Sequence, residues 1–192
     1  MSFTNPAPEQ IRDLLRRAHT LAVVGLSPNP ARPSFGVAKA MQGFGYRIIP
    51  VRPAIESVLG EKACPDLHHL PGPVDIVDVF RASDHVAAIV DDCIALRAQW
   101  LKSARKQDTD VLHGNREQSD PVSGARQRPR SLPQRPDKAE DKLCQGQFSA
   151  PALWLQEGVV DEAAALRAQE AGIMVVMDRC IYKDYRAFAQ EP

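Results

Sequence analysis

The sequence predicts an α/β protein built around a doubly wound parallel sheet of about five strands. Short runs of β-branched and other apolar residues alternate along the chain with segments whose apolar residues recur at helical spacing. The strand-like runs are apolar on both faces, which is typical of parallel strands covered by helices. The first run ends at Gly25 and is followed by a polar, proline-rich loop that leads into a helix.

The predicted elements follow from these periodicities and from the residues that end them. Gly45 is expected to close one helix in a left-handed conformation, and Ser83 and Asp161 are expected to cap the starts of two others. Strands are predicted at residues 20–26, 46–51, 74–80, 152–155 and 173–177. Helices are predicted at residues 8–18, 34–44, 83–98 and 162–171, and a short extended piece at 58–62.

The alternation breaks between residues 99 and 150. This segment mixes basic and acidic residues with Gln, Pro and Ser and shows no apolar periodicity, so it should bury too little surface to order itself. We therefore expect 1–98 and 151–192 to form a single domain, and 99–150 to be a disordered or loosely ordered insertion before the fourth strand. Because it enters the sheet at the amino end of that strand, it should leave the opposite edge untouched.

Composition narrows the range of functions. Lys and Arg number 24, and so do Asp and Glu, so the net charge of zero gives no general attraction for nucleic acid or membranes. The chain has 4 cysteines without a CxxC pair and no apolar leader at its start, which favours a reducing, cytoplasmic location. No apolar run approaches the roughly 20 residues of a membrane-spanning helix.

A ligand of such a sheet is expected beyond the carboxyl ends of the strands. There Gly25 lets the backbone approach a ligand closely, and the next helix presents free N–H groups, with Ser34 as its N-cap or first-turn hydroxyl. Arg32 lies in the same loop, so a phosphate is the expected occupant. The candidate binding residues at the strand ends are Gly25, Ser27, Asn29, Arg32, Ser34, Arg52, Pro53, Phe80, Arg81, Gln156, Gly158 and Cys180.

Two features distinguish this site from that of a dinucleotide enzyme. The GxGxxG fingerprint is absent, and Arg52 stands near the position where an acidic residue would hold a ribose diol. A guanidinium grips phosphate in a bidentate manner. Arg32, Arg52 and Arg81 converging on one face would suit a ligand with several phosphates, such as NADP or coenzyme A, although each could be a solvated loop charge.

The chain resembles the small CoA-binding proteins, which consist of little more than the CoA-binding domain of the succinyl-CoA synthetase alpha subunit. The resemblance rests on residues 23–27 with 32–34, on 45–51, on 74–81, and on 153–159 with 177–180. It implies a Rossmann-like domain that binds coenzyme A, with the 3′-phospho-ADP near the first two loops and pantetheine directed toward the later ones. The chain departs from its relatives at Arg52, where Asn is common, and in the long insertion.

The sequence predicts no catalytic constellation. The synthetase phosphorylates a histidine in a second domain that this chain lacks, and only His85 falls near the ligand edge. Asp75 and Asp78 lie on a buried-type strand and should pair with neighbouring loops instead of acting as an acid and a base. Cys180 follows the fifth strand and could form a mixed disulfide with coenzyme A, helped by Arg179, or be an inert buried thiol.

The sequence therefore favours a non-catalytic module that binds coenzyme A or an acyl-CoA as a sensor or carrier, without metal. Two alternatives remain open: an NADP-binding, oxidoreductase-like domain, and an interaction module that uses the basic residues of the insertion. The interspersed acids of that segment argue against nucleic acid as its partner. A homodimer or another protein partner also remains open.

Overall fold

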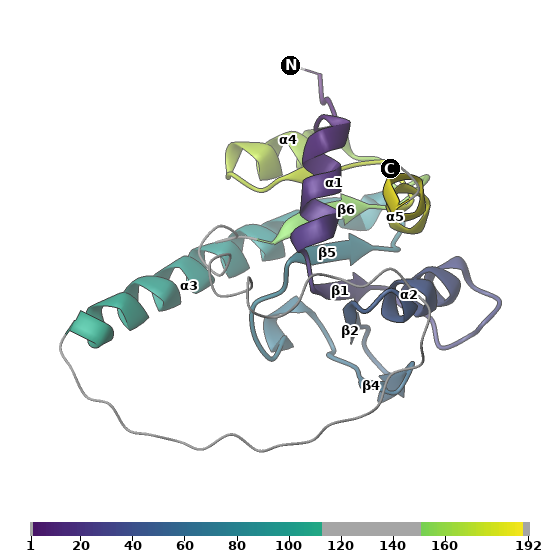
Figure 1. Cartoon of the computed structure of the whole chain (residues 1–192), viewed down its shortest axis with the longest axis horizontal. Coiled ribbons are helices and arrows are strands. Elements are labelled where there is room, and N and C mark those ends of the chain that lie inside the picture. Colours follow the sequence, from purple (N-terminus) through teal and green to yellow (C-terminus); the bar gives the residue numbers. More distant parts are fainter. Residues whose placement is uncertain (1, 113–150, 190–192) are drawn as a thin grey trace.

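The computed structural model describes residues 2–112 and 151–189, with the side chains of 104–112 left aside (Figure 1). Residues 113–150, which make up most of the predicted insertion, lie outside the described residues. The described part is an α/β fold with one central sheet and helices on both faces, as the sequence predicts.

The central sheet has five parallel strands in the order β2-β1-β5-β6-β7. The strands are β1 (Thr20–Val24), β2 (Arg47–Val51), β5 (Ile76–Val79), β6 (Ala152–Leu155) and β7 (Val175–Val176). Nearly all of their residues are buried, because helices cover both faces. The doubly wound parallel sheet predicted from the sequence is confirmed.

Two hydrophobic layers hold the helices to the sheet (Figure 1). On one face, Val77, Val79 and Leu153 pack against α3 (Val86–Leu112) and α4 (Glu162–Glu170). On the other face, Val23, Ile76 and Trp154 pack against α1 (Pro8–Arg17), α2 (Pro33–Gly43) and α5 (Ile181–Ala189). The core is therefore divided by the sheet, and every strand contributes to both layers.

Small elements close the sheet beside β2. A hairpin of β3 (Ser57–Val58) and β4 (Glu61–Lys62) leads to Cys64, whose backbone bridges to Val51 and continues the sheet by one residue. Two short 3-10 helices follow, η1 (Leu67–His69) and η2 (Ser83–His85), before and after β5. The short extended piece predicted at 58–62 is thus a hairpin.

Most of the predicted stops and starts are confirmed. Gly45 ends α2 with a φ of 91°, and Asp161 caps α4 by accepting a hydrogen bond from the Ala164 N–H at 2.9 Å. The prediction that Ser83 caps a helix is wrong. Its hydroxyl instead accepts a hydrogen bond from the N–H of Val160 at 3.0 Å, which ties the loop after β5 to the loop after β6.

The helix predicted to end near residue 98 continues to Leu112, and α3 projects beyond the sheet (Figure 1). The sequence placed its end where apolar spacing stops, but a helix that leaves the body of the protein no longer needs an apolar face. Trp100 of α3 packs against the hydrophobic cluster between the sheet and helices α3 and α4.

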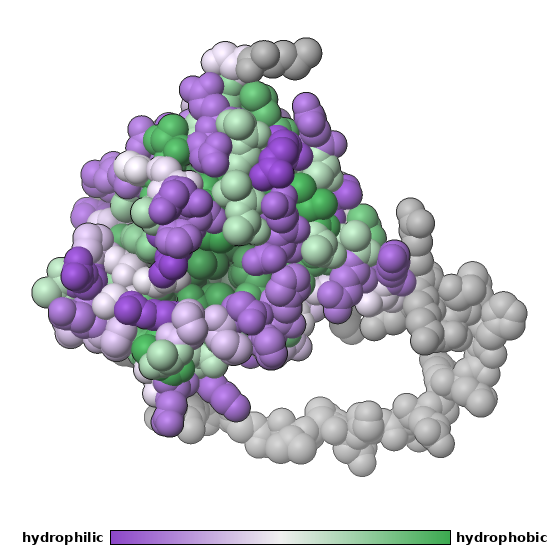
Figure 2. All heavy atoms as spheres, turned by 180° about the vertical axis from the view of Figure 1, so that it is seen from behind, coloured by the Kyte–Doolittle hydropathy of each residue, from purple (hydrophilic) through white to green (hydrophobic). Residues whose placement is uncertain are grey.

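The face opposite the viewer of Figure 1 is largely hydrophilic, with apolar residues visible between the polar ones (Figure 2). Val160 is an exposed large hydrophobic residue, with 43% of its surface accessible. Among the described residues no helix is long and apolar enough to cross a membrane, and no group of three potential metal ligands occurs.

Candidate functional site

The strand order reverses between β1 and β5, since the chain moves to β2 on one side and to β5, β6 and β7 on the other. In open α/β sheets, the loops that diverge at such a point leave a crevice at the carboxyl ends of the strands, where ligands bind. Here the segments that lead away from this point are the loop after β1, the residues after β2, and those after β5. We call residues 25–34, 52–53 and 80–81 the switch-point loops.

Gly25 allows the loop after β1 to lie close to the residues after β5. It has a φ of 84°, and its N–H donates to the Val51 carbonyl at 2.9 Å. A Cβ built on Gly25 would lie 2.7 Å from the Phe80 carbonyl oxygen and 3.0 Å from the Arg81 Cδ. Any side chain at position 25 would therefore push the loop after β5 outward, so glycine is required both for conformation and for space.

The remainder of the first loop holds itself in place by short hydrogen bonds. The hydroxyl of Ser34 accepts from the Ser27 N–H at 3.1 Å, the Ser27 hydroxyl from the Asn29 N–H at 3.2 Å, and the Asn29 side chain from the Ala31 N–H at 2.9 Å. Arg32 is the N-cap residue, and Ser34 lies in the first turn of α2. Hydrogen bonds within the loop therefore fix its conformation, and the loop leads directly into the amino end of α2.

Two of the predicted arginines flank this loop. An Nη1 atom of Arg52 lies 3.5 Å from the Leu26 carbonyl oxygen, and Arg81 lies against Gly25 with its Nη2 3.3 Å from the His85 Nε2. Arg32 is exposed at the start of α2. In the described part of the chain no carboxylate forms an ion pair with Arg32, Arg52 or Arg81. Their charges are therefore available to an anionic ligand.

The loops after β6 and β7 are joined by a different set of contacts. The Gly158 N–H donates to the Asp178 carboxylate at 2.7 Å, and Lys183 contacts both Glu157 oxygens at 2.7 and 2.8 Å. The φ of Asp178 is 57°, a left-handed conformation that Asp tolerates better than most residues. Asp178 is thus a residue of this edge that the candidate binding residues did not include, although it follows the fifth predicted strand.

A buried pair lies where the two sets of loops meet. Gln156 follows β6 and is 4% exposed, and its Nε2 donates to the Asp78 Oδ1 at 2.7 Å. Asp78, on β5, is 1% exposed. Burial raises the pKa of Asp78 to about 7, and the hydrogen bond from Gln156 opposes this shift. The expectation that Asp78 pairs with a neighbouring loop is confirmed.

Asp75 lies at the other end of β5 and also serves the backbone. Its Oδ2 accepts hydrogen bonds from the N–H groups of His19 and Thr20, at 2.8 and 2.9 Å. It therefore fixes the entry to β1 at the amino edge of the sheet, away from the switch-point loops.

Cys180 is 9% exposed and follows β7. The guanidinium of the neighbouring Arg179 is paired with a carboxylate and not with the thiol. Its Nε and Nη2 donate to the two Asp184 oxygens at 2.6 and 2.8 Å. The hydrogen bonds that Arg179 donates to Asp184 raise the pKa of Arg179. The mixed disulfide between Cys180 and coenzyme A stays a prediction, and the expected help from Arg179 would require this pair to open.

The predicted residues therefore form two groups. Gly25, Ser27, Asn29, Ser34, Arg52, Phe80 and Arg81 are connected through the contacts described above, with Arg32 and the exposed Pro53 at the margin. Gln156, Gly158 and Cys180 belong to the second group, after β6 and β7. Asp78 joins this group, although the sequence showed only its place on a strand.

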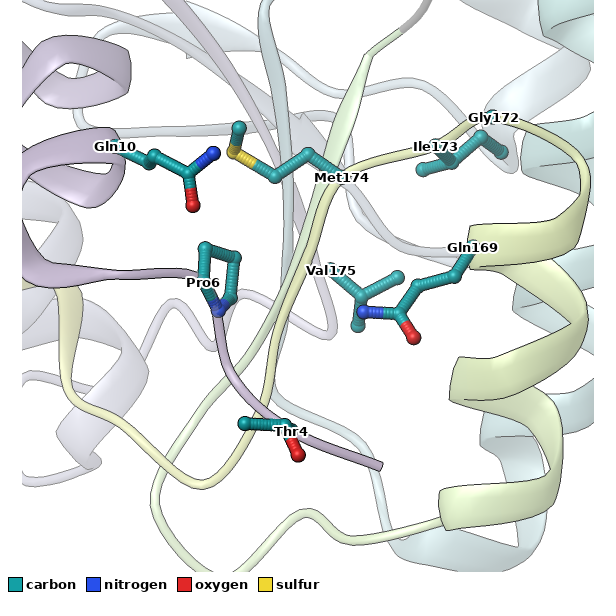
Figure 3. Close-up of a pocket in the computed structure, with 8 residues that line it drawn as sticks. All are labelled: Thr4, Pro6, Gln10, Gln169, Gly172, Ile173, Met174 and Val175. Carbon is teal, nitrogen blue, oxygen red and sulfur yellow. The ribbon is translucent and has the colours of Figure 1, made fainter. Parts of the chain in front are cut away.

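A shallow groove of about 340 Å³ lies elsewhere, beside the amino end of β7 (Figure 3). It is bordered by the amino-terminal segment and by the chain between α4 and β7, and its lining comprises Thr4, Pro6, Gln10, Gln169, Gly172, Ile173, Met174 and Val175. The Asn5 side chain donates to the Met177 carbonyl at 3.0 Å and accepts from the Met177 N–H at 2.8 Å. These are the two backbone groups that a neighbouring strand would otherwise pair with. The groove contains none of the predicted site residues.

Comparison with known proteins identifies the family of this chain. The family model described as a CoA binding domain matches residues 19–118 and 128–186, so the chain belongs to this family. The match extends into both ends of the segment 99–150 that was predicted to be inserted. The uncharacterized protein YneT of Bacillus subtilis (strain 168) is 33% identical over 177 residues, which cover 92% of this chain and 93% of YneT.

Solved structures share the fold. A hypothetical protein from Pyrococcus horikoshii OT3 is 23% identical, with a TM-score of 0.64, over 98% of this chain and 99% of that one. A Thermus thermophilus protein is 25% identical, with a TM-score of 0.65, over 95% of this chain and 99% of that one. This chain therefore shares its fold with these two proteins over almost the full length of each.

Proposed function

We propose that the protein binds coenzyme A or an acyl-CoA in the switch-point loops, as a non-catalytic module that senses or carries this ligand. Membership of the CoA binding domain family supports a ligand of this class. The observation that carries the proposal is a pair of arginines at the loop after β1: the Arg52 Nη1 lies 3.5 Å from the Leu26 carbonyl oxygen, and the Arg81 Cδ lies against Gly25. Neither arginine has an acidic partner in the described part of the chain.

The arrangement suits phosphate more than a ribose diol. The amino end of α2 offers the positive end of a helix dipole, and Arg81 lies against Gly25 in the loop that leads into this helix. Arg52 supplies positive charge at the end of β2, where a carboxylate would repel a phosphate attached to the ribose. A ligand with a pyrophosphate and a ribose phosphate would therefore contact all three arginines.

Isothermal titration calorimetry with coenzyme A, dephospho-coenzyme A and NADP tests this proposal. We expect coenzyme A to bind about tenfold more tightly than dephospho-coenzyme A, since charge-assisted hydrogen bonds contribute about 1.5 to 3 kcal/mol. R52Q and R81Q should each weaken coenzyme A binding by about tenfold. R167Q is the matched control, because Arg167 is an exposed arginine on α4 that pairs with Asp91.

Equal affinity for coenzyme A and dephospho-coenzyme A would contradict the role of the arginines. Tighter binding of NADP than of coenzyme A would favour the oxidoreductase-like alternative. The non-catalytic part of the proposal is tested by incubating the protein with acetyl-CoA: we expect it to be recovered unchanged, and steady release of free thiol would show an enzyme.

A further inference from the structure

We propose that Asp78 couples ligand binding at the switch-point loops to a proton: the neutral form of Asp78 supports the anionic ligand, and its ionisation weakens binding. This inference rests on the proposed function, because the ligand is taken to be coenzyme A. It assigns a positioning and regulatory role to a residue that does not itself touch the ligand.

Asp78 occupies an unusual place for a carboxyl group. It lies in the middle strand of the sheet, in register with Val23 of β1 and Trp154 of β6, both of them fully buried. Its side chain shares the face of Val23 and Trp154, which is covered by α1, α2 and α5. Among the described strand residues, Asp78 is the only buried one whose side chain can carry a charge.

Only half of the carboxyl group is satisfied. Oδ1 accepts from the Gln156 Nε2 at 2.7 Å, whereas Oδ2 is buried and has no hydrogen-bond partner in the described part of the chain. A bare carboxylate oxygen in an apolar interior is costly, and a proton on Oδ2 removes the charge. The raised pKa of Asp78, about 7, agrees with this geometry. The carboxyl therefore changes charge within the range of ordinary cellular pH.

In residues 2–112 and 151–189, no neighbouring charge compensates an ionised Asp78. The charged groups on the elements over this face, or on the loops at its edge, have other partners or lie at the surface: Asp13, Arg16 and Arg17 pair on α1, Lys183 with Glu157, and Arg179 with Asp184. Lys39 on α2, Arg186 on α5, Arg81, His85 and Asp178 are exposed. None of these forms an ion pair or hydrogen bond with Asp78.

The position of Asp78 links its charge to the ligand edge. It precedes Phe80 by two residues, and its partner Gln156 is the first residue after β6, with a backbone N–H 3.4 Å from the Val79 carbonyl oxygen. Ionisation would place a negative charge on β5, close to the switch-point loops at which the phosphates of the ligand are proposed to bind. One such charge about 10 Å from a phosphate, at an effective dielectric constant of about 20, changes affinity by roughly tenfold.

Calorimetric titration between pH 6 and pH 8.5 tests this coupling. Dephospho-coenzyme A is the probe, because it lacks the phosphomonoester whose second pKa of about 6 would itself contribute. We expect the affinity of the unmodified protein to fall roughly tenfold across this range. D78N, which keeps an acceptor for Gln156 and carries no charge, should bind with an affinity that is constant within about twofold.

D75N is the matched control, since it removes a carboxylate from the same strand at the amino edge of the sheet. It should keep the pH profile of the unmodified protein. H85Q is measured alongside, because histidine side chains also change charge in this range and His85 lies beside Arg81. The profile should persist in H85Q.

A fall in affinity that is the same in D78N, or no fall in the unmodified protein, would overturn the inference alone. Failure of coenzyme A and dephospho-coenzyme A to bind at any pH would overturn the proposed function together with it. Should D78N not fold, titration of H85Q near pH 7.5 in two buffers of different ionisation enthalpy replaces it. Net proton uptake on binding is expected there, and its absence would overturn the inference.

Discussion

The two halves of the carboxyl edge treat their charges in opposite ways. After β1, β2 and β5, the arginines Arg32, Arg52 and Arg81 have no carboxylate partner in the described part of the chain. After β6 and β7, Arg179 and Lys183 are each paired, with Asp184 and Glu157. The second half uses its charges to fix its own loops, whereas the unpaired arginines of the first half are the ones that the proposed function assigns to a ligand.

The largest effect on stability and on coenzyme A affinity is expected from a side chain at position 25. Gly25→Ala should lower the free energy of unfolding by about 3 kcal/mol, because it combines left-handed strain with a Cβ 2.7 Å from the Phe80 carbonyl oxygen. Coenzyme A affinity should fall more than about tenfold, as the switch-point loops separate. Urea unfolding and calorimetry measure the two effects.

Gly45→Ala is the control for this change. Gly45 also has a positive φ, of 91°, but nothing lies within 4 Å of a Cβ built there. It should lose only about 1 kcal/mol of stability, from backbone strain, and retain coenzyme A affinity. Similar losses in the two variants would show that close approach to Phe80 does not matter.

A smaller effect on stability is expected when the ion pair between Arg179 and Asp184 is removed. Asp184→Asn should cost about 1 to 2 kcal/mol of unfolding free energy, a value discounted because Arg179 is partly exposed. Coenzyme A affinity should stay within about twofold, since this pair lies apart from the switch-point arginines. Lys183→Gln is the control: its pair with Glu157 is exposed, and we expect no measurable change in stability. A large loss of affinity in D184N would remove the distinction between the halves.

The smallest expected effect is on the rate of a thiol–disulfide exchange at Cys180, and not on the stability of the protein. We expect the disulfide of coenzyme A to exchange with the Cys180 thiolate, which forms the mixed disulfide and releases one coenzyme A as its thiolate. The rate should be slow, because the thiol is 9% exposed, and faster in D184N, where Arg179 is no longer held by a carboxylate. Mass spectrometry detects the adduct, with C180S as the control; its absence from both proteins would show an inert thiol.

Much of this fold could be predicted because its signals are local. The strand around Val77 is apolar on both faces, Asp161 precedes a helical run, and Gly45 follows one. The end of α3 was misplaced by apolar spacing, which reports packing and not helix formation. Ser83 was assigned as a cap on local grounds, but its hydroxyl bonds to Val160, which is 77 residues away. Here a tertiary contact displaced a local one.

By itself, the sequence determined the alternation of strands and helices, the glycine after β1 and the positive charge of the loops at the ligand edge. These depend on residue type and on spacing of a few residues. The tertiary structure alone decided which loops meet: the reversal between β1 and β5, the approach of Gly25 to Phe80, and the pairing of Asp78 with Gln156 across 78 positions. Such pairings depend on strand order and register, which no local pattern records.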